Sequence, residues 1–85
     1  MSEELQEVGR VTHYFTKISV AIVELKSLLS VGDHIYFKGP NTDFTQIVKS
    51  MQIEHQNITQ AKAGQSIGLK VDDRVRESDR VYKII

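Results

Sequence analysis

The chain has 85 residues, with 11 basic side chains, 11 acidic side chains, three histidines and no cysteine. Its length predicts one domain with a modest core, since a domain of this size buries only about 60–65 % of its unfolded surface. The lack of cysteine excludes disulfides and thiolate sites, and no apolar leader or membrane-spanning run is visible. These features predict a cytoplasmic protein without a membrane partner.

The N-terminus is acidic and has no apolar periodicity. Residues 1–7 are therefore expected to form a disordered tail, and residues 8–85 a single β-barrel domain. The tail holds Glu3, Glu4 and Glu7, so the remaining residues carry 11 basic and 8 acidic groups, a surplus of three positive charges. This surplus permits a nucleic-acid surface but does not require one.

Apolar residues recur with a period of two, which is typical of β-strands. Strands are predicted over residues 7–15, 18–25, 34–39, 66–71 and 80–85. The alternation places His13 and Phe15 on the same side as Val11. The expected core consists of Val11, Val20, Ile22, Ile35, Phe37, Ile47, Ile67, Leu69 and Val71.

Residues 44–55 form a sixth strand whose alternation changes phase, and a bulge near Lys49 or Ser50 would restore a common face. Gly32 and Gly64 each precede a strand, where a turn often requires positive φ. Residues 57–64 could form one helical turn, with Asn57 as N-cap and Gly64 after its end. The charged residues 72–78 are expected to form a turn or a short 3₁₀ segment.

No arrangement of residues indicates catalysis or a cofactor. His13, His34 and His55 recur every 21 residues, but the strand assignment does not bring them to one point, as metal ligands must be. Asp72, Asp73, Glu77 and Asp79 alternate with arginines in a manner typical of solvated ion pairs. The sequence therefore predicts a protein that is not an enzyme, with no catalytic, cofactor-binding or metal site.

The most basic stretch is the C-terminal third. Lys70, Arg74, Arg76 and Arg80 are the candidate nucleic-acid-binding residues, and Tyr36 and Tyr82 could stack on bases. The alternative interpretation is an ordinary solvated surface with tyrosines at its rim.

The order of these features resembles the second domain of translation elongation factors such as elongation factor Tu, over Val8 to Ile85. The residues that carry the resemblance are Gly9-x-Val11, Val31-Gly32-Asp33, Val48-x-Ser50-Met51 and residues 63–69, AGQSIGL. Within that superfamily the chain is most similar to the C-terminal barrel of the bacterial collagenase-like peptidases (class U, family thirty-two) and to free-standing translation-elongation-factor-like proteins.

The resemblance implies an all-β fold, a small closed six-stranded antiparallel barrel of the translation-factor domain 2 type. It implies a non-catalytic accessory or binding module that associates with RNA, tRNA or the ribosome. The alternative is a protein-interaction module that docks on a separate or lost peptidase domain through an apolar rim such as Leu28, Leu29 and Tyr36. The chain is expected to be a monomer. No GxxxxGK[ST] phosphate loop is present.

Overall fold

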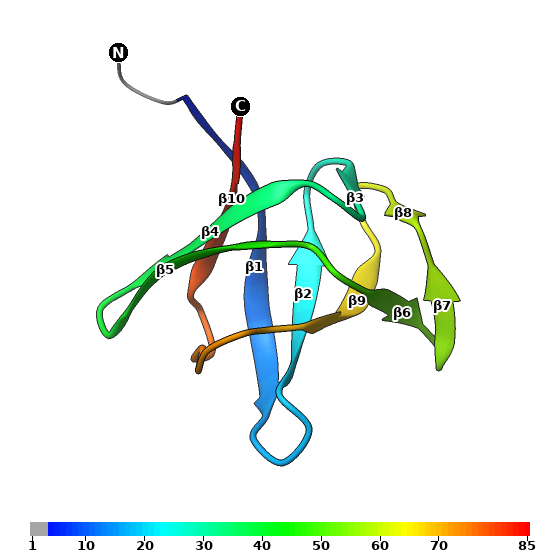
Figure 1. The fold of residues 1–85 in the computed structure, drawn as a ribbon, viewed down its shortest axis with the longest axis horizontal. Coiled ribbons are helices and arrows are strands. Elements are labelled where there is room, and N and C mark those ends of the chain that lie inside the picture. The colour runs from blue at the N-terminus through cyan, green and yellow to red at the C-terminus, as the bar shows by residue number, and fades with distance from the viewer. Residues whose placement is uncertain (1–3) are drawn as a thin grey trace.

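The computed structural model describes residues 4–85, and all regular structure in that range is β-strand (Figure 1). The ten strands are β1 (Leu5–Phe15), β2 (Val20–Leu25), β3 (Leu29–Ser30), β4 (His34–Gly39), β5 (Thr42–Ile47), β6 (Met51–Ile53), β7 (Gln56–Ile58), β8 (Gln60–Ala61), β9 (Ser66–Lys70) and β10 (Arg80–Ile84). The all-β prediction is confirmed.

Within residues 4–85, eight strands form one antiparallel sheet in the order β5-β4-β10-β1-β2-β9-β6-β7, and β3 pairs with β8. This corrects the predicted closed six-stranded barrel, because the sheet is open, with β5 and β7 at its edges. Consecutive strands β5 and β6 stand first and seventh in the order. Residues 48–50, which belong to no strand, carry the chain between them.

Side chains join β5 and the residues after it to the end of β9 and the loop that follows β9. Gln46 of β5 donates from Nε2 to the Lys70 carbonyl at 2.9 Å and accepts the Asp72 N–H at 2.7 Å. Lys49 pairs with Asp72 at 2.7 Å. We call the gap between β5 and residues 70–74 the seam. A side-chain bridge at one end of the seam takes the place of a backbone ladder.

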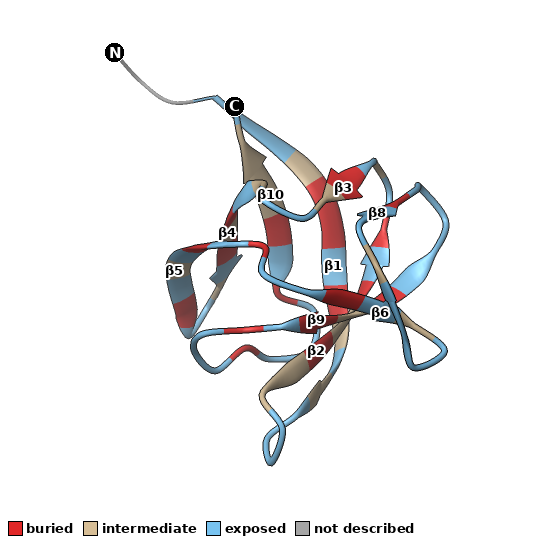
Figure 2. Ribbon diagram, turned by 45° about the vertical axis from the view of Figure 1, so that its right-hand side comes forward, coloured by how far each residue is buried: buried red, intermediate tan, exposed pale blue. Residues whose placement is uncertain are grey.

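The core lies on the inner side of the curved sheet, and buried positions alternate with exposed ones along the strands (Figure 2). Six of the predicted core residues are buried: Val11 on β1, Ile35 and Phe37 on β4, Ile67 and Leu69 on β9, and Val71 directly after β9. Three predictions were wrong. Ile47 is 46% exposed, and Val20 and Ile22 lie half-buried on the outer face.

The errors in β2 and β1 have different causes. In β2 the buried positions are Ala21, Val23 and Leu25, and the exposed Glu24, which shares the parity of Val20 and Ile22, is the only polar residue that marks the outer face. In β1 the register shifts between Val11 and His13. This bulge reverses the faces of the residues that follow, so His13 and Phe15 are exposed rather than inward.

The phase change in residues 44–55 marks the end of one strand and the start of another. The interruption, residues 48–50, lies where a bulge was predicted, and both Val48 within it and Met51 directly after it are buried. The predicted helical turn over residues 57–64 is absent from the described chain. Those residues belong largely to β7 and β8. β7 pairs with β6 in a hairpin whose turn residues, Glu54 and His55, have φ of 50° and 66°.

The prediction for the two strand-entry glycines is confirmed. Gly32 has φ of 96° and Gly64 has φ of 90°. A Cβ at either position would meet no atom within 4 Å, so the need for glycine is conformational and not steric.

Part of the tail predicted over residues 1–7 belongs to a strand. β1 begins at Leu5, and residues 5–7 pair with β10, with Leu5 opposite Ile84 and Glu7 opposite Tyr82. Residues 1–3 lie outside the described range. Both described ends of the chain therefore lie side by side (Figure 1).

Candidate functional site

The four predicted nucleic-acid-binding residues lie around the loop between β9 and β10. Lys70 ends β9, Arg80 begins β10, and Arg74 and Arg76 lie in the loop. The Lys70 Nζ donates to the Ile18 carbonyl at 2.9 Å, in the turn between β1 and β2. The Arg80 guanidinium lies 2.9 Å from the Glu7 carboxylate. Two of the four charges thus have protein partners.

Sequence reasoning missed the neighbours that the sheet gives Arg80. Across the strands it lies between Lys38 and Arg10 on the outer face, so three basic residues form a row. The row ends at an acidic residue on each side, because Asp43 is opposite Lys38 and Glu24 is opposite Arg10. Strand pairing brings these three residues together, although they lie far apart in the sequence.

Glu7 is the centre of the ion pairs beside this row. Desolvation pushes its pKa upward, but the hydrogen bond and charge of Lys26 and the charge of Arg80 together lower the pKa below its usual value. Lys26 lies 3.4 Å from the Glu7 carboxylate. The basic row therefore carries little unbalanced charge.

An aromatic and apolar surface adjoins the basic row on the outer face of the same strands. Leu5, Tyr36, Thr45 and Ile84 line a shallow groove there. The Tyr36 and Tyr82 rings lie 6.2 Å apart between centroids. We call Leu5, Tyr36, Thr45, Tyr82 and Ile84 the Tyr36 face. Of the predicted apolar rim, Leu28 is exposed but Leu29 is fully buried, so that part of the prediction was wrong.

Asp43 borders the polar edge of the Tyr36 face. Hydrogen bonding to the Asp43 carboxylate, desolvation and the carboxylate charge together raise the pKa of the Tyr36 phenol. The phenol therefore stays neutral at neutral pH. Tyr36 presents an amphipathic aromatic side chain, the type that proteins favour in interfaces.

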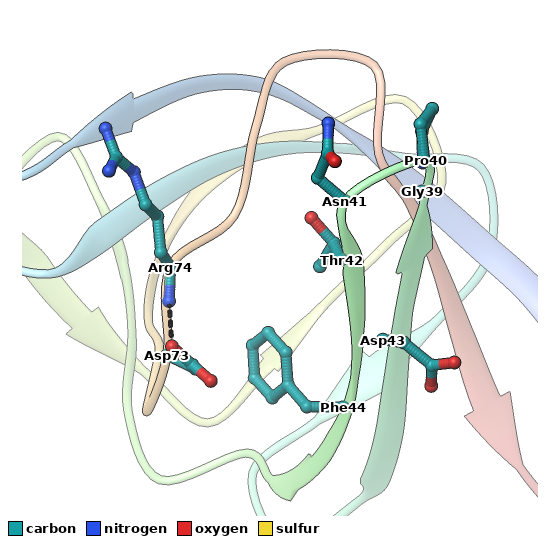
Figure 3. A pocket seen from close by; sticks show the side chains of 8 residues that line it. All are labelled: Gly39, Pro40, Asn41, Thr42, Asp43, Phe44, Asp73 and Arg74. Atoms are coloured by element: carbon teal, nitrogen blue, oxygen red, sulfur yellow. Dashed lines mark hydrogen bonds between the residues drawn. The ribbon is translucent and has the colours of Figure 1, made fainter.

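A cavity of about 430 Å³ lies at the other end of the seam from Gln46 (Figure 3). One wall is the turn from Gly39 to Asn41 together with the start of β5, and the opposite wall is Asp73 and Arg74. Phe44 forms its floor, and its ring stacks on the buried Phe37 ring at 5.0 Å. The Asp73 carboxylate accepts the Arg74 backbone N–H at 2.7 Å.

A buried carboxylate supports the turn beside this cavity. Asp79 is 1% exposed, accepts the Arg76 N–H at 2.8 Å and accepts the Thr42 hydroxyl. It also lies against Gly39, where any Cβ would collide with the carboxylate. The sequence interpretation placed Asp79 among solvated ion pairs, and this was wrong because its backbone and the loop enclose it.

The three histidines lie on separate elements. His13 is on β1, 3.7 Å from Glu77, His34 is on β4, and His55 is in the turn between β6 and β7. Among residues 4–85 no group of three or more His, Cys, Asp or Glu side chains is arranged to hold a metal ion. No helix in the described chain is long and apolar enough to cross a membrane.

Two kinds of known protein are similar in sequence. An uncharacterized protease of Methanocaldococcus jannaschii is 46% identical over 77 residues, which are 89% of this chain and 19% of that protein. A collagenase of Porphyromonas gingivalis is 37% identical over 78 residues, which are 89% of this chain and 22% of that protein. The chain thus spans about a fifth of the length of these curated relatives. No protein-family model matches it.

The fold matches a solved domain. The C-terminal domain of a Geobacillus thermoleovorans protein described as a U32 peptidase superposes with a TM-score of 0.86 at 23% identity, covering 92% of this chain and 91% of that domain. Its selenomethionine variant gives 0.85, with 89% and 96% covered. The predicted similarity to collagenase-like peptidases is confirmed at the level of a shared segment and fold. The resemblance to elongation factor Tu stays a prediction.

Proposed function

We propose that the chain is a non-catalytic β-module that docks on a peptidase catalytic domain through the Tyr36 face. The observation that carries the proposal is the surface itself. It combines a partly exposed apolar centre, two tyrosines included, with a charged border of Lys38, Arg80 and Glu7. An apolar, aromatic centre with a polar rim is the usual composition of a protein–protein interface.

The similarity to longer proteins supports the choice of partner. The matching segment makes up about a fifth of relatives named protease and collagenase, so most of each relative lies outside it. In the solved relative the corresponding unit is a C-terminal domain. In this fold the start of β1 lies beside the end of β10. Leu5 and Ile84, which pair there, belong to the Tyr36 face, so a preceding domain would join next to it.

The RNA hypothesis has weaker support. Of its four residues, Lys70 and Arg80 are engaged with Ile18 and Glu7, and the row that includes Arg80 ends in acidic residues. Binding to RNA depends on phosphate neutralisation and therefore on unbalanced positive charge. Arg74 and Arg76 alone supply little unbalanced positive charge. RNA binding is accordingly the rival outcome of the test below.

The proposal is tested with the Methanocaldococcus jannaschii relative from which the 77 matching residues have been removed. Isothermal titration should show that this protein binds the 85-residue chain at both low and high salt, because apolar docking responds weakly to ionic strength. Tyr36→Ser should weaken binding about 30-fold or more, the effect of losing a central aromatic anchor.

Phe15→Ser is the control, because Phe15 is an exposed aromatic residue that lies in a separate groove with Ile18 and Val20. It should change the affinity less than about twofold. Melting curves establish that both variants are folded. Equal losses from both variants, or no complex at all, would refute docking through the Tyr36 face. If tRNA binds instead, with an affinity that falls steeply as salt rises, the RNA hypothesis replaces it.

A further inference from the structure

The open end of the seam has the features of a site for an extended peptide. Its cavity, about 430 Å³, is within the range of about 300–1,000 Å³ typical of ligand sites. The floor is the half-buried Phe44 ring. One wall is a sheet edge, and an edge strand offers backbone groups that can pair with another chain.

The alternation along β5 identifies which backbone groups face the seam. The Val48 N–H donates to the Asp33 carbonyl at 2.8 Å, and the Gly32 N–H donates to the Val48 carbonyl at 2.9 Å. Val48 therefore directs its polar groups toward β4. In an antiparallel ladder this direction alternates, so Asp43 and Thr45 direct theirs away from β4. These groups are placed to pair with an added strand.

Arg74 supplies a charge at one end of the same opening. Its guanidinium has no acidic partner within 4.0 Å among residues 4–85, whereas Arg80 and Arg10 both have one. Figure 3 shows the Arg74 side chain extending to the Asn41 end of the opening, and the Asp73 carboxylate at the Phe44 end. An incoming carboxylate would therefore find its favourable position beside Arg74.

We propose that the seam binds the carboxyl end of an extended peptide, which adds to β5 as an antiparallel strand. The direction follows from the geometry. An antiparallel partner ends where β5 begins, at Thr42, which is the end that Arg74 and Asn41 border. The terminal carboxylate then meets the guanidinium, and a peptide side chain lies over Phe44.

The opposite edge of the sheet lacks these features. β7 has only three residues, Gln56–Ile58, and none of them lines the cavity at the seam. Gln52 and Asn57 hydrogen-bond to each other across β6 and β7 at 2.9 Å. An added strand at β7 would gain few backbone bonds and no charged anchor, so the proposal is specific to β5.

Carboxyl-end recognition suits a peptidase partner, since hydrolysis of a peptide bond leaves one new carboxylate and one new amine. This use in holding cleaved chains rests on the proposed function. The binding itself does not, because the 85-residue chain alone contains every group that takes part. Failure of the peptide experiment would therefore leave docking through the Tyr36 face untouched.

The test uses the synthetic peptide acetyl-Thr-Val-Thr-Val-Thr with a free carboxylate, titrated into the chain and followed by amide chemical shifts. Residues 42–45 and 73–74 should shift. The same peptide with a terminal amide should bind about tenfold more weakly, because it lacks a charge-assisted hydrogen bond. A peptide N-methylated at the amides that face β5 should not bind detectably.

Arg74→Gln should weaken the free-acid peptide about tenfold and leave the amidated peptide unchanged, since both changes remove the same contact. Arg76→Gln is the matched control, because Arg76 is in the same loop but does not line the cavity. It should alter binding less than about twofold. Equal binding of acid and amide peptides, shifts confined to other residues, or a chain dimer paired through β5 would overturn the proposal.

Discussion

The two ends of the seam differ in how the same pair of segments is joined. At one end Gln46, 5% exposed, bonds to the backbone of Lys70 and Asp72, and Lys49 adds an ion pair with Asp72. At the other end Phe44 and Arg74 face each other across a cavity. The Gln46 amide, which both donates and accepts, thus replaces a pair of backbone hydrogen bonds between β5 and residues 70–72. At the Phe44 end no such bond joins these two described segments, and the seam is open there.

This difference separates stability from binding. Residues that form the floor or the bridge of the seam should affect the free energy of unfolding, whereas Arg74 at its open end should affect only ligand affinity. The variants below probe the floor, the turn at the open end, the bridge and a remote ion pair, in order of expected effect.

Phe37→Ala should have the largest effect. Phe37 is fully buried beneath Phe44, and its removal leaves a cavity under the floor of the open end. The expected loss is about 3–5 kcal/mol of unfolding free energy, which could be most of the stability of so small a domain. Urea denaturation measures it. A loss below about 1 kcal/mol would show that the floor is not packed as described.

Gly39→Ala should cost about 1–3 kcal/mol, because a Cβ would collide with the buried Asp79 carboxylate. Gly68→Ala is the control. There the nearest neighbour of a Cβ is Val20 Cγ1 at 3.5 Å, an ordinary contact. Its free energy of unfolding should stay within about 0.5 kcal/mol of the parent. The same denaturation experiment compares the two, and equal stabilities would contradict the close packing of Gly39 on Asp79.

Gln46→Leu tests the bridge. It leaves the Lys70 carbonyl and the Asp72 N–H without their partner, at an expected cost of about 1–3 kcal/mol. Hydrogen exchange of the Asp72 amide should also accelerate more than global unfolding explains. Gln60→Leu, at an exposed position on β8, is the control and should leave that exchange rate unchanged. Unchanged exchange in Gln46→Leu would show that the seam is closed by other contacts.

Glu7→Gln should have the smallest effect and one that depends on pH. The folded-state pKa of Glu7 is lowered from 4.5, so its ion pairs stabilise the fold above that pH and are lost as the pH falls through the lower folded value. The variant should melt below the parent at neutral pH and together with it in strong acid. Added salt should narrow the neutral-pH difference, because the pairs are near the surface. A pH-independent difference would assign the effect to packing.

The sequence allowed prediction of the features that depend on local chemistry. Alternation located the strands with Ile35, Phe37, Ile67 and Leu69 inward, and positive φ at Gly32 and Gly64 followed from turn requirements. Both depend on residues close together in the chain. The face of β2 had one signal, the charged Glu24 at the parity of Val20 and Ile22, which the apolar residues on both faces outweighed. The bulge after Val11 has no marker in its residue types.

The seam and the basic row could not be predicted because each depends on pairing between distant strands. Gln46 meets Lys70 and Asp72 over more than twenty residues of sequence. Arg80 joins Lys38 and Arg10 only through the strand order. Gln46 did carry a signal, since a polar residue shares the inward parity of Phe44 and Val48, and a buried glutamine implies backbone partners.

The most direct test of the central claim is an amide shift map of the labelled chain with the Methanocaldococcus jannaschii relative lacking its matching segment. Docking predicts shifts at Leu5, Tyr36, Thr45 and Ile84, on the outer face, and none at Asp73 or Arg74 in the seam. Shifts at Asp73 and Arg74 with an unchanged Tyr36 face, or no shift anywhere, would contradict the claim that this face binds a peptidase domain.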